Sequence, residues 1–454
     1  MKFFTKQLMG GFNRLGNHLK KLLSFFRLDD PNVIFYIFLT AFVLDSVLAV
    51  FFKIPVFVGV MIVFLPFLLT SITLQGKEKW FFVGFFALFI LTGIFSGWYY
   101  IFDRKNISDV LFILVFATSY YFYRQQSERL SVLTPKIFFI VALMLFGATF
   151  VGYNSLKWME IKSLNQTNVT GIKKALTEDE KQELNLSKSK NRKKLKQKAA
   201  KPADTEVFRH YRNGLFRLPH VAAYFFGFLF IYFGYQFQRD KQKIYLFFCI
   251  LAFGLMFFTG VRTWVAVFAV SLILYAIQRR YFKYAAIMFL VGLVFVLFRE
   301  ALYAQTKETF IGQFFSLLIT ATENFTRLSR MVIWKSWWLE MNRFSFENWI
   351  TGKGFYMSVT ANYRNLNWAE WFHNDFLSII FSYGIIGFAF YAGLFVRIFR
   401  DNKDLIMNNV FLFTFYFTML FAAFFNGMYY YFPILLMFLF VKLLQQEREK
   451  KCVQ

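Results

Sequence analysis

The chain has 454 residues, of which 57% are hydrophobic and 23% aromatic, and its mean hydropathy is +0.45. One soluble core cannot bury so much apolar surface, so the composition excludes a soluble globular protein and predicts a polytopic membrane protein. The formal charge of +26 is spread over short loops between apolar runs, which favours membrane orientation over nucleic-acid binding. The two cysteines, Cys249 and Cys452, indicate neither a disulfide framework nor a thiolate metal site.

The chain begins with a basic, aromatic-rich segment at residues 1–30, which we interpret as a cytoplasmic amphipathic arm on the inner membrane surface. Twelve apolar runs follow, and each is long enough to be a transmembrane helix. Helices are expected because backbone groups in lipid must be satisfied within their own segment and no run alternates as a barrel strand does. The runs lie at about 31–52, 55–75, 81–102, 107–125, 137–153, 219–237, 244–259, 263–278, 284–298, 375–399, 405–425 and 428–444.

The distribution of basic residues predicts the orientation. With a cytoplasmic N-terminus, the short inner loops and their borders carry fourteen Lys or Arg, whereas the short outer loops carry four. The positive-inside rule therefore places both termini in the cytoplasm. The predicted division is an arm (1–30), spans one to five (31–153), an external basic loop (154–218), spans six to nine (219–298), an external catalytic subdomain (299–374), spans ten to twelve (375–444) and a cytoplasmic tail (445–454).

The two external segments differ in composition. Residues 154–218 carry sixteen basic and seven acidic residues, and a loop of this length is translocated largely regardless of charge. Its low hydrophobicity predicts a partly mobile, solvated insert, with attraction to anionic lipid or glycan as the alternative. Residues 299–374 are rich in Trp, Phe and Tyr and contain the turn-forming "TGKGF", so they predict a partly helical subdomain packed over the membrane helices.

Basic and aromatic residues are predicted to gather on the outer face. Arg262 starts span eight after a tight reversal at Gly260, and a charge at such depth tends to face a cavity. The alternative for a single arginine is an interfacial residue that reaches lipid phosphate. Arg327 and Arg330 are three residues apart and share one helical face. Tryptophans follow whose flat faces suit sugar rings or isoprenoid chains, among them Trp334 and Trp338.

His373, Asn374 and Asp375 stand at the start of span ten. A lone histidine is more often structural than catalytic, but its coincidence with arginines on one face points to chemistry. Guanidinium groups match phosphate oxygens, and histidine accepts a proton near neutral pH. The combination predicts glycosyl transfer from a lipid pyrophosphate, in which arginines hold the pyrophosphate and His373 activates an acceptor hydroxyl. The chain lacks GxxxxGK, HExxH, GxSxG and spaced Cys/His ligands, so we expect no metal and no cofactor.

Two stretches carry a family resemblance. "TRLSRMVIWKSWWLEMNRFSFENWITGKGF" followed by "WFHNDFLSIIFSYGIIGF" resembles the O-antigen ligase and O-antigen polymerase superfamily of bacterial envelope enzymes. The resemblance extends over about residues 210–400, including "RNGLFRLPHVAAYF" at 212–225, whereas the first five spans match in character alone. It implies a GT-C-like, all-α integral membrane fold of about twelve spans with a large periplasmic loop before span ten.

The resemblance also implies roles for residues. The implied catalytic residues are His373, Arg262 and Arg327. The implied substrate-binding residues are Arg330, Trp334, Trp338, Asn374, Asp375 and His220, and a structural role is the stronger alternative for His220. Asn374 or Asp375 is expected to fix the tautomer of His373. The long basic insert at 154–218 departs from the family pattern and leaves open how the acceptor approaches.

The resemblance implies a metal-independent, inverting glycosyltransferase of the bacterial inner membrane, with its site facing the periplasm or exterior. The implied partners are an undecaprenyl-pyrophosphate-linked oligosaccharide donor, a glycan or lipid A-core acceptor, membrane lipid and a chain-length regulator protein. Polymerase and ligase stay open, because they differ only in the acceptor. The rival functions are a lipid-linked glycan flippase or other transporter, and a membrane acyltransferase. Transporters tend to show repeats and mid-membrane ionisable groups; here Asp45 is the main buried acid and the other polar groups gather at one face, which favours an enzyme.

Overall fold

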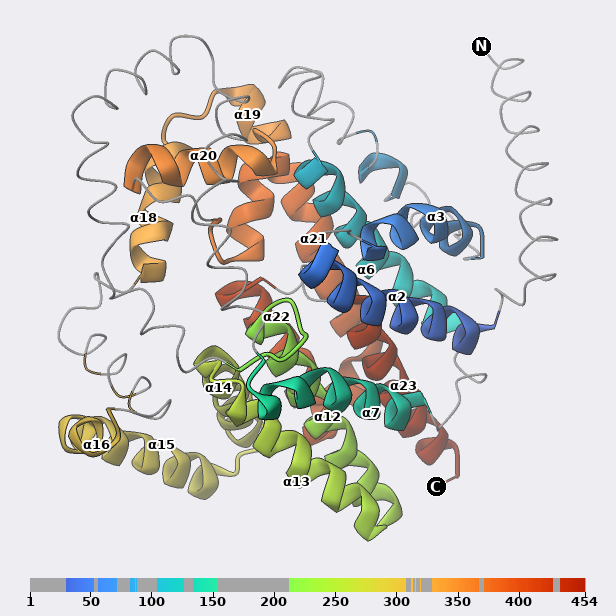
Figure 1. Cartoon of the computed structure of the whole chain (residues 1–454), viewed down its shortest axis with the longest axis vertical. Coiled ribbons are helices and arrows are strands. Elements are labelled where there is room, and N and C mark those ends of the chain that lie inside the picture. The colour runs from blue at the N-terminus through green and yellow to red at the C-terminus, as the bar shows by residue number, and fades with distance from the viewer. Residues whose placement is uncertain are drawn as a thin grey trace.

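The computed structural model describes residues 30–52, 56–71, 82–85, 87, 104–125, 134–153, 212–307, 312, 315, 319, 329–366, 371–427 and 433–453. Every named element in this part of the chain is a helix, so the protein is an all-α membrane protein, as the composition predicts (Figure 1). The elements in the first half are α2 (Pro31–Phe52), α3 (Val56–Ser71), α6 (Arg104–Gln125), α7 (Thr134–Gly147) and the 3₁₀ helix η2 (Ala148–Val151). Those in the second half are α12 (Pro219–Asp240), α13 (Lys243–Phe258), α14 (Arg262–Gln278), α15 (Phe282–Leu297), α16 (Arg299–Thr306), α18 (Ser329–Met341), α19 (Phe346–Thr351), α20 (Phe355–Leu366), α21 (Asp375–Asn408), α22 (Val410–Phe425) and α23 (Pro433–Val453).

The helices follow the predicted apolar runs closely. Eleven of the twelve runs coincide with helices, and the run at 81–102 lies largely outside the described residues. Among the described helices, three are long and apolar enough to cross a membrane alone, namely α2, α7 continued by η2, and α21, or four if α15 and α16 form one span bent by 66°. The total of about twelve spans therefore stays a prediction. Helix α21 continues to Asn408, past the predicted end at 399, because the polar residues after the apolar run keep helical pairing.

The large phenylalanine content packs one helix against another. Phe42 of α2 stacks on Phe225 of α12 with ring centroids 4.7 Å apart, and Phe228 of α12 lies 4.3 Å from Phe415 of α22. Such offset and edge-on pairs add to the free energy of burial. Together with aliphatic side chains they form one continuous apolar core that joins α2, α3, α6, α7, α12, α13, α14, α21, α22 and α23.

Asp45, the buried acid of the sequence analysis, has a structural contact. Its Oδ1 accepts a hydrogen bond of 3.2 Å from the backbone N–H of Phe57, in the first turn of α3. The first turn of a helix has N–H groups without helical partners, and a carboxylate there also interacts favourably with the helix dipole. This contact joins α2 to α3 across their short connection.

The alternating helix directions create two ends of the bundle. At one end, which we call the site face, the backbone N–H of Arg212 donates to Thr259 O at 3.1 Å, joining the segment before α12 to the end of α13. At the opposite face, Arg279 after α14 donates to Asn408 at the end of α21, with a distance of 3.0 Å. Asn409 donates there to Glu447 of α23 at 3.0 Å.

Helices α18, α19 and α20 gather around the N-terminal half of α21 (Figure 1). Helices α18 and α20 share a small apolar core with α21 that is separate from the main one and includes Ile333, Met341, Ala361, Phe372 and Phe381. Buried Glu340 of α18 accepts hydrogen bonds from Arg343 at 2.9 Å and from Asn365 of α20 at 3.1 Å. The segment before span ten is thus helical and packed on α21.

A break in α21 receives this helix cluster. Gly384 has φ 64° and ψ −165°, which no other residue type adopts readily, so the helical hydrogen bonds are interrupted there. The backbone N–H of Lys353 donates to Phe381 O and that of Gly354 donates to Ser382 O, both at 2.9 Å. The turn-forming "TGKGF" therefore docks by its backbone onto carbonyls next to the break. Gly352, with φ 77°, lies directly against the same backbone.

The close contact at Gly384 predicts that substitution of this glycine lowers the stability of the protein. A Cβ atom at this position would lie 2.1 Å from Ile350 O and would also force an L residue into a glycine conformation. We expect Gly384→Ala to lower the free energy of unfolding by about 1–3 kcal/mol through backbone strain alone, measured by thermal unfolding of the purified protein. Gly254→Ala is the control, because open space surrounds Gly254 in α13. Equal stability of the two variants would contradict the proposed docking.

Candidate functional site

The site begins with the first turn of α21. Asn374 is the N-cap, and its Oδ1 accepts a hydrogen bond from the backbone N–H of Leu377 at 3.0 Å. Asp375 is fully buried, and its Oδ2 accepts from the hydroxyl of Tyr391, on the part of α21 beyond the break at Gly384, at 2.7 Å. Asn374, predicted to bind substrate, thus starts the helix, while Asp375 is held inside it. Neither is described with a hydrogen bond to the ring of His373.

His373 stands just before this cap in an uncommon conformation. Its φ is 51°, in the left-handed region that histidine, asparagine and aspartate enter more readily than most residues. Two tryptophans hold the segment: Trp334 of α18 donates from Nε1 to Phe372 O at 3.1 Å, and the Trp371 ring lies 4.9 Å from the His373 ring between centroids. The imidazole is partly buried. Non-glycine residues held in this region often belong to functional sites.

Gly427, directly after α22, closes one side of the site. With φ 81° it passes so near α21 that an added Cβ would lie 2.1 Å from the Trp371 ring and 2.6 Å from Asp375 Oδ1. Only glycine allows this approach. The end of α22 is thereby fixed against the segment that carries His373.

Arg330 of α18 is the arginine of the site whose side chain the structure describes. Its Nη2 donates to Thr263 Oγ1 at 3.0 Å and to Asn426 Oδ1 at 3.1 Å, so the guanidinium bridges the start of α14 and the end of α22. Thr263 and Asn426 are uncharged side chains. Tyr224 of α12 completes this group, since its hydroxyl bonds to the Asn426 side chain and lies within electrostatic reach of Arg330 and Asp375.

The surroundings keep His373 uncharged. Burial is the main cause that lowers its pKa from 6.5 to about 3, and the positive charges of Arg330 and of protonated His220 oppose its protonation further. His220 is the second residue of α12, after Pro219 at its start. The structure therefore brings His220, Arg330 and His373 together from three distant parts of the sequence.

The other sequence-predicted residues are placed less fully. Arg262 is the first residue of α14, next to the Thr263 that bonds Arg330, but its side chain lies outside the described residues. Arg327 lies outside them altogether. Trp334 supports the backbone before His373, whereas Trp338 is 60% exposed. Within the described part of the chain, no group of three or more His, Cys, Asp or Glu is placed to hold a metal ion.

Sequence reasoning missed several residues that build the site. Thr263 and Asn426 bond to Arg330, Tyr224 interacts with Asn426, and Tyr391 bonds to Asp375. Asn426 and Gly427 form an "NG" pair after an apolar run, and this pattern predicts a turn. The turn pattern is the local sequence feature that could have drawn attention to these two residues. Thr263 and the two tyrosines lie within apolar helices, where nothing in the local pattern separates them from core residues.

The fold and site define a helical membrane protein in which an arginine and an uncharged histidine meet at one end of the bundle. Residues 247–392 match the family described as O-antigen ligase, a segment that contains both Arg330 and His373. Over this segment the match confirms the resemblance to the O-antigen ligase and polymerase superfamily, whose members are membrane enzymes of the glycosyltransferase type. Among curated proteins and among solved structures, no match to this chain was found.

The electrostatic coupling in the site predicts the titration of His373. Removing the Arg330 charge with Arg330→Gln should raise the His373 pKa above about 3, yet leave it below 6.5, because burial is the larger cause. The measurement is an NMR titration of ring-labelled histidine, with the signal assigned by its loss in His373→Asn. Arg343→Gln is the control, since that side chain is 56% exposed and pairs with Glu340. A His373 pKa that responds equally to both variants, or to neither, would refute the coupling.

The lowered pKa of His373 also makes the stability of the protein depend on pH. Folding favours uncharged His373, so this contribution to stability is fully present above pH 6.5 and is lost as the pH falls from 6.5 toward about 3.

Proposed function

We propose that the protein is a membrane glycosyltransferase that moves a glycan from an undecaprenyl-pyrophosphate donor to an acceptor hydroxyl at the outer face of the bacterial inner membrane. The observation that carries the proposal is the pairing of Arg330 with His373 at one end of the bundle, within the segment that matches O-antigen ligase. The positive-inside distribution of short loops supports an outward-facing site, since the opposite face holds most of their Lys and Arg.

Arg330 is the proposed anchor for the pyrophosphate. A guanidinium carries a permanent charge and five N–H donors that match phosphate oxygens. The bonds to Thr263 and Asn426 both use Nη2 and fix the plane of the group. By the family resemblance, Arg262 and Arg327 share this role. The position of Arg262 next to Thr263 supports its assignment.

His373 is the proposed proton acceptor. The acceptor oxygen forms a bond to the anomeric carbon, the bond from that carbon to the phosphate oxygen breaks, and the electron pair leaves with the lipid pyrophosphate. The hydroxyl proton passes to an imidazole nitrogen of His373. Attack opposite to the leaving group inverts the anomeric centre, and no metal takes part in these steps.

Donor binding itself would prepare this histidine. In the free site, burial and the Arg330 charge make His373 a weak base. A pyrophosphate at Arg330 offsets that positive charge and favours an imidazolium nearby, which raises the pKa of His373. Proton acceptance is therefore strongest when the donor is in place, so the acceptor is activated only when transfer can follow.

The acceptor distinguishes two forms of this function. A polymerase extends another lipid-linked glycan, with a chain-length regulator as partner, whereas a ligase transfers to lipid A-core. Incubation of the purified protein with lipid-linked oligosaccharide separates the two: a ladder of longer chains indicates a polymerase, and product formed only after lipid A-core is added indicates a ligase. Translocation of the lipid without a new glycosidic bond would instead indicate a flippase.

Variants at His373 test the catalytic assignment. Asparagine and glycine both tolerate the backbone conformation at φ 51°, so His373→Asn and His373→Gly should fold. Removal of a proton acceptor typically costs about 10²–10⁴-fold in rate, and we expect initial transfer rates to fall by this amount in both variants. Insertion and thermal stability, measured beside activity, should stay near the wild-type values.

His373→Ala is the matched control for the backbone. Alanine removes the same imidazole but fits the left-handed region less well, so it should lose activity equally and stability more. Transfer at the wild-type rate in the asparagine variant would refute the assignment. Loss of stability without loss of specific activity would show that His373 is structural.

The dependence of rate on pH tests the coupling between donor and histidine. The profile of kcat/KM reports the free enzyme, in which the His373 pKa is about 3, so it should lack an acid limb near 6.5. The profile of kcat reports the bound complex, in which the pKa is raised, so its acid limb should lie at higher pH. Initial rates measured at several donor concentrations between pH 5 and 8 give both profiles. Coinciding acid limbs would contradict substrate-assisted proton transfer.

A further inference from the structure

A second polar cluster lies at the other end of α21. Asn402 lies in the C-terminal part of α21, beyond the break at Gly384, and its partner Arg448 follows Glu447, which bonds Asn409 at the opposite face. The cluster is therefore on the opposite face of the bundle from Arg330 and His373, and it has no contact with the proposed reaction.

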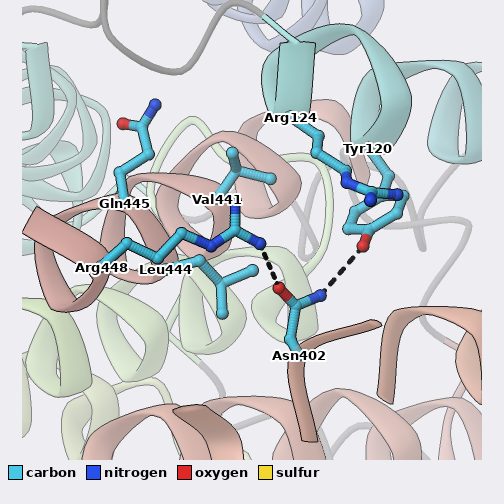
Figure 2. Close-up of a pocket in the computed structure, with 7 residues that line it drawn as sticks. All are labelled: Tyr120, Arg124, Asn402, Val441, Leu444, Gln445 and Arg448. Carbon is cyan, nitrogen blue, oxygen red and sulfur yellow. Dashed lines mark hydrogen bonds between the residues drawn. The ribbon is translucent and has the colours of Figure 1, made fainter. Parts of the chain in front are cut away.

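The cluster surrounds a recess between α6, α21 and α23. Its lining residues are Tyr120, Arg124, Asn402, Val441, Leu444, Gln445 and Arg448 (Figure 2). Asn402 lies between the two polar walls: its Nδ2 donates to the Tyr120 hydroxyl at 3.0 Å, and its Oδ1 accepts from Arg448 Nη2 at 2.6 Å. The backbone at Asn402 leaves the helical conformation, with φ −131° and ψ 18°. This break directs its amide across the recess.

Positive charge exceeds negative charge around the recess. Asp401 accepts from Arg124 Nη1 at 2.9 Å and from Arg397 Nε at 2.7 Å, and Arg400 lies 3.8 Å from its other oxygen. Arg448 bonds to the uncharged Asn402. Glu447 of α23 accepts hydrogen bonds from Tyr235 and Asn409. Three guanidinium groups therefore share the Asp401 carboxylate, and Arg448 adds a fourth positive charge from α23.

Gln445 supplies an independent sign of a ligand. This side chain is 5% exposed, yet its Nε2 has no hydrogen-bond partner among the described residues, although it lines the recess. A buried donor without a partner costs free energy, so it is retained where another molecule satisfies it. The described contacts also use one of five N–H donors on Arg124 and one on Arg448.

We propose that this recess binds a phosphate group, with Arg124 and Arg448 as charged donors and the Gln445 amide as a neutral one. Phosphate matches the chemistry of the site because it accepts from several N–H groups at once and balances the excess of positive charge. Basic pockets between membrane helices on one face are suited to anionic headgroups. Either an anionic lipid or a soluble phosphate presents this group, and the experiment separates the two sources.

The test uses the full-length protein in nanodiscs of phosphatidylcholine. In the first arm, phosphatidylglycerol is added to the bilayer, and lipid retained by the protein is counted by native mass spectrometry. In the second arm, inorganic phosphate is added to the solution. The thermal midpoint is followed in both arms. We expect phosphate-bearing ligand to raise the midpoint of the wild type in at least one arm, and the arm that responds identifies the source.

Two variants and a control test whether the ligand binds in the recess. The double variant Arg124→Gln with Arg448→Gln should weaken retention or stabilisation about tenfold, while Arg397 still pairs with Asp401. Gln445→Met keeps the side-chain shape and removes the unpartnered amide, so it should weaken binding without lowering the midpoint of the ligand-free protein. Arg279→Gln is the control, because Arg279 also donates to an asparagine on this face but lies outside the recess.

A stabilising effect that persists in both recess variants, or that falls equally in Arg279→Gln, would overturn the proposal. So would a wild type that responds in neither arm. Weaker binding in Gln445→Met would not be explained by misfolding, because this substitution changes no charge and leaves every described ion pair in place.

Discussion

The backbone contact between the turn at Gly352–Gly354 and the broken helix at Gly384 is the constraint on which the candidate site depends. A regular helix would use the carbonyls of Phe381 and Ser382 internally, and no loop could then dock there. The break releases both groups, and the turn satisfies them with its own N–H groups. Unsatisfied backbone groups at membrane depth are costly, so the break and the turn require each other. Their contact holds the helix cluster that carries Arg330 over the start of α21.

Neutral side chains orient the charge placed there. Arg330 bonds to Thr263 and Asn426, and the nearby carboxylate of Asp375 accepts from the hydroxyl of Tyr391. Burial keeps His373 uncharged. A protonated histidine beside Arg330 would add a second buried cation to the site and would cost further free energy.

The sequence predicts the parts of this structure that local physics decides. The eleven apolar runs within the described residues are helices because their backbone bonds close within each run, and α21 starts at the predicted start of span ten. The break at Gly384 was not predictable, since the surrounding "SYGIIGF" contains no proline and no charged residue. The partners of Arg330 were missed for another reason: Thr263 and Asn426 meet it only through tertiary packing. Asn374 was singled out from the sequence as a substrate-binding residue, but its helix-capping contact was not predicted.

The two ends of α21 solve the same electrostatic problem in different ways. At the site face, Arg330 bonds to two neutral side chains and lies near an uncharged histidine. At the opposite face, Asp401 is shared among several arginines, which reduces their mutual repulsion while an excess of charge remains. The first arrangement suits a ligand that must leave after each reaction, whereas the second suits one that stays bound. Each lies beside a break in the helix, at Gly384 and Asn402, because a break frees backbone and side-chain groups that a regular turn would consume.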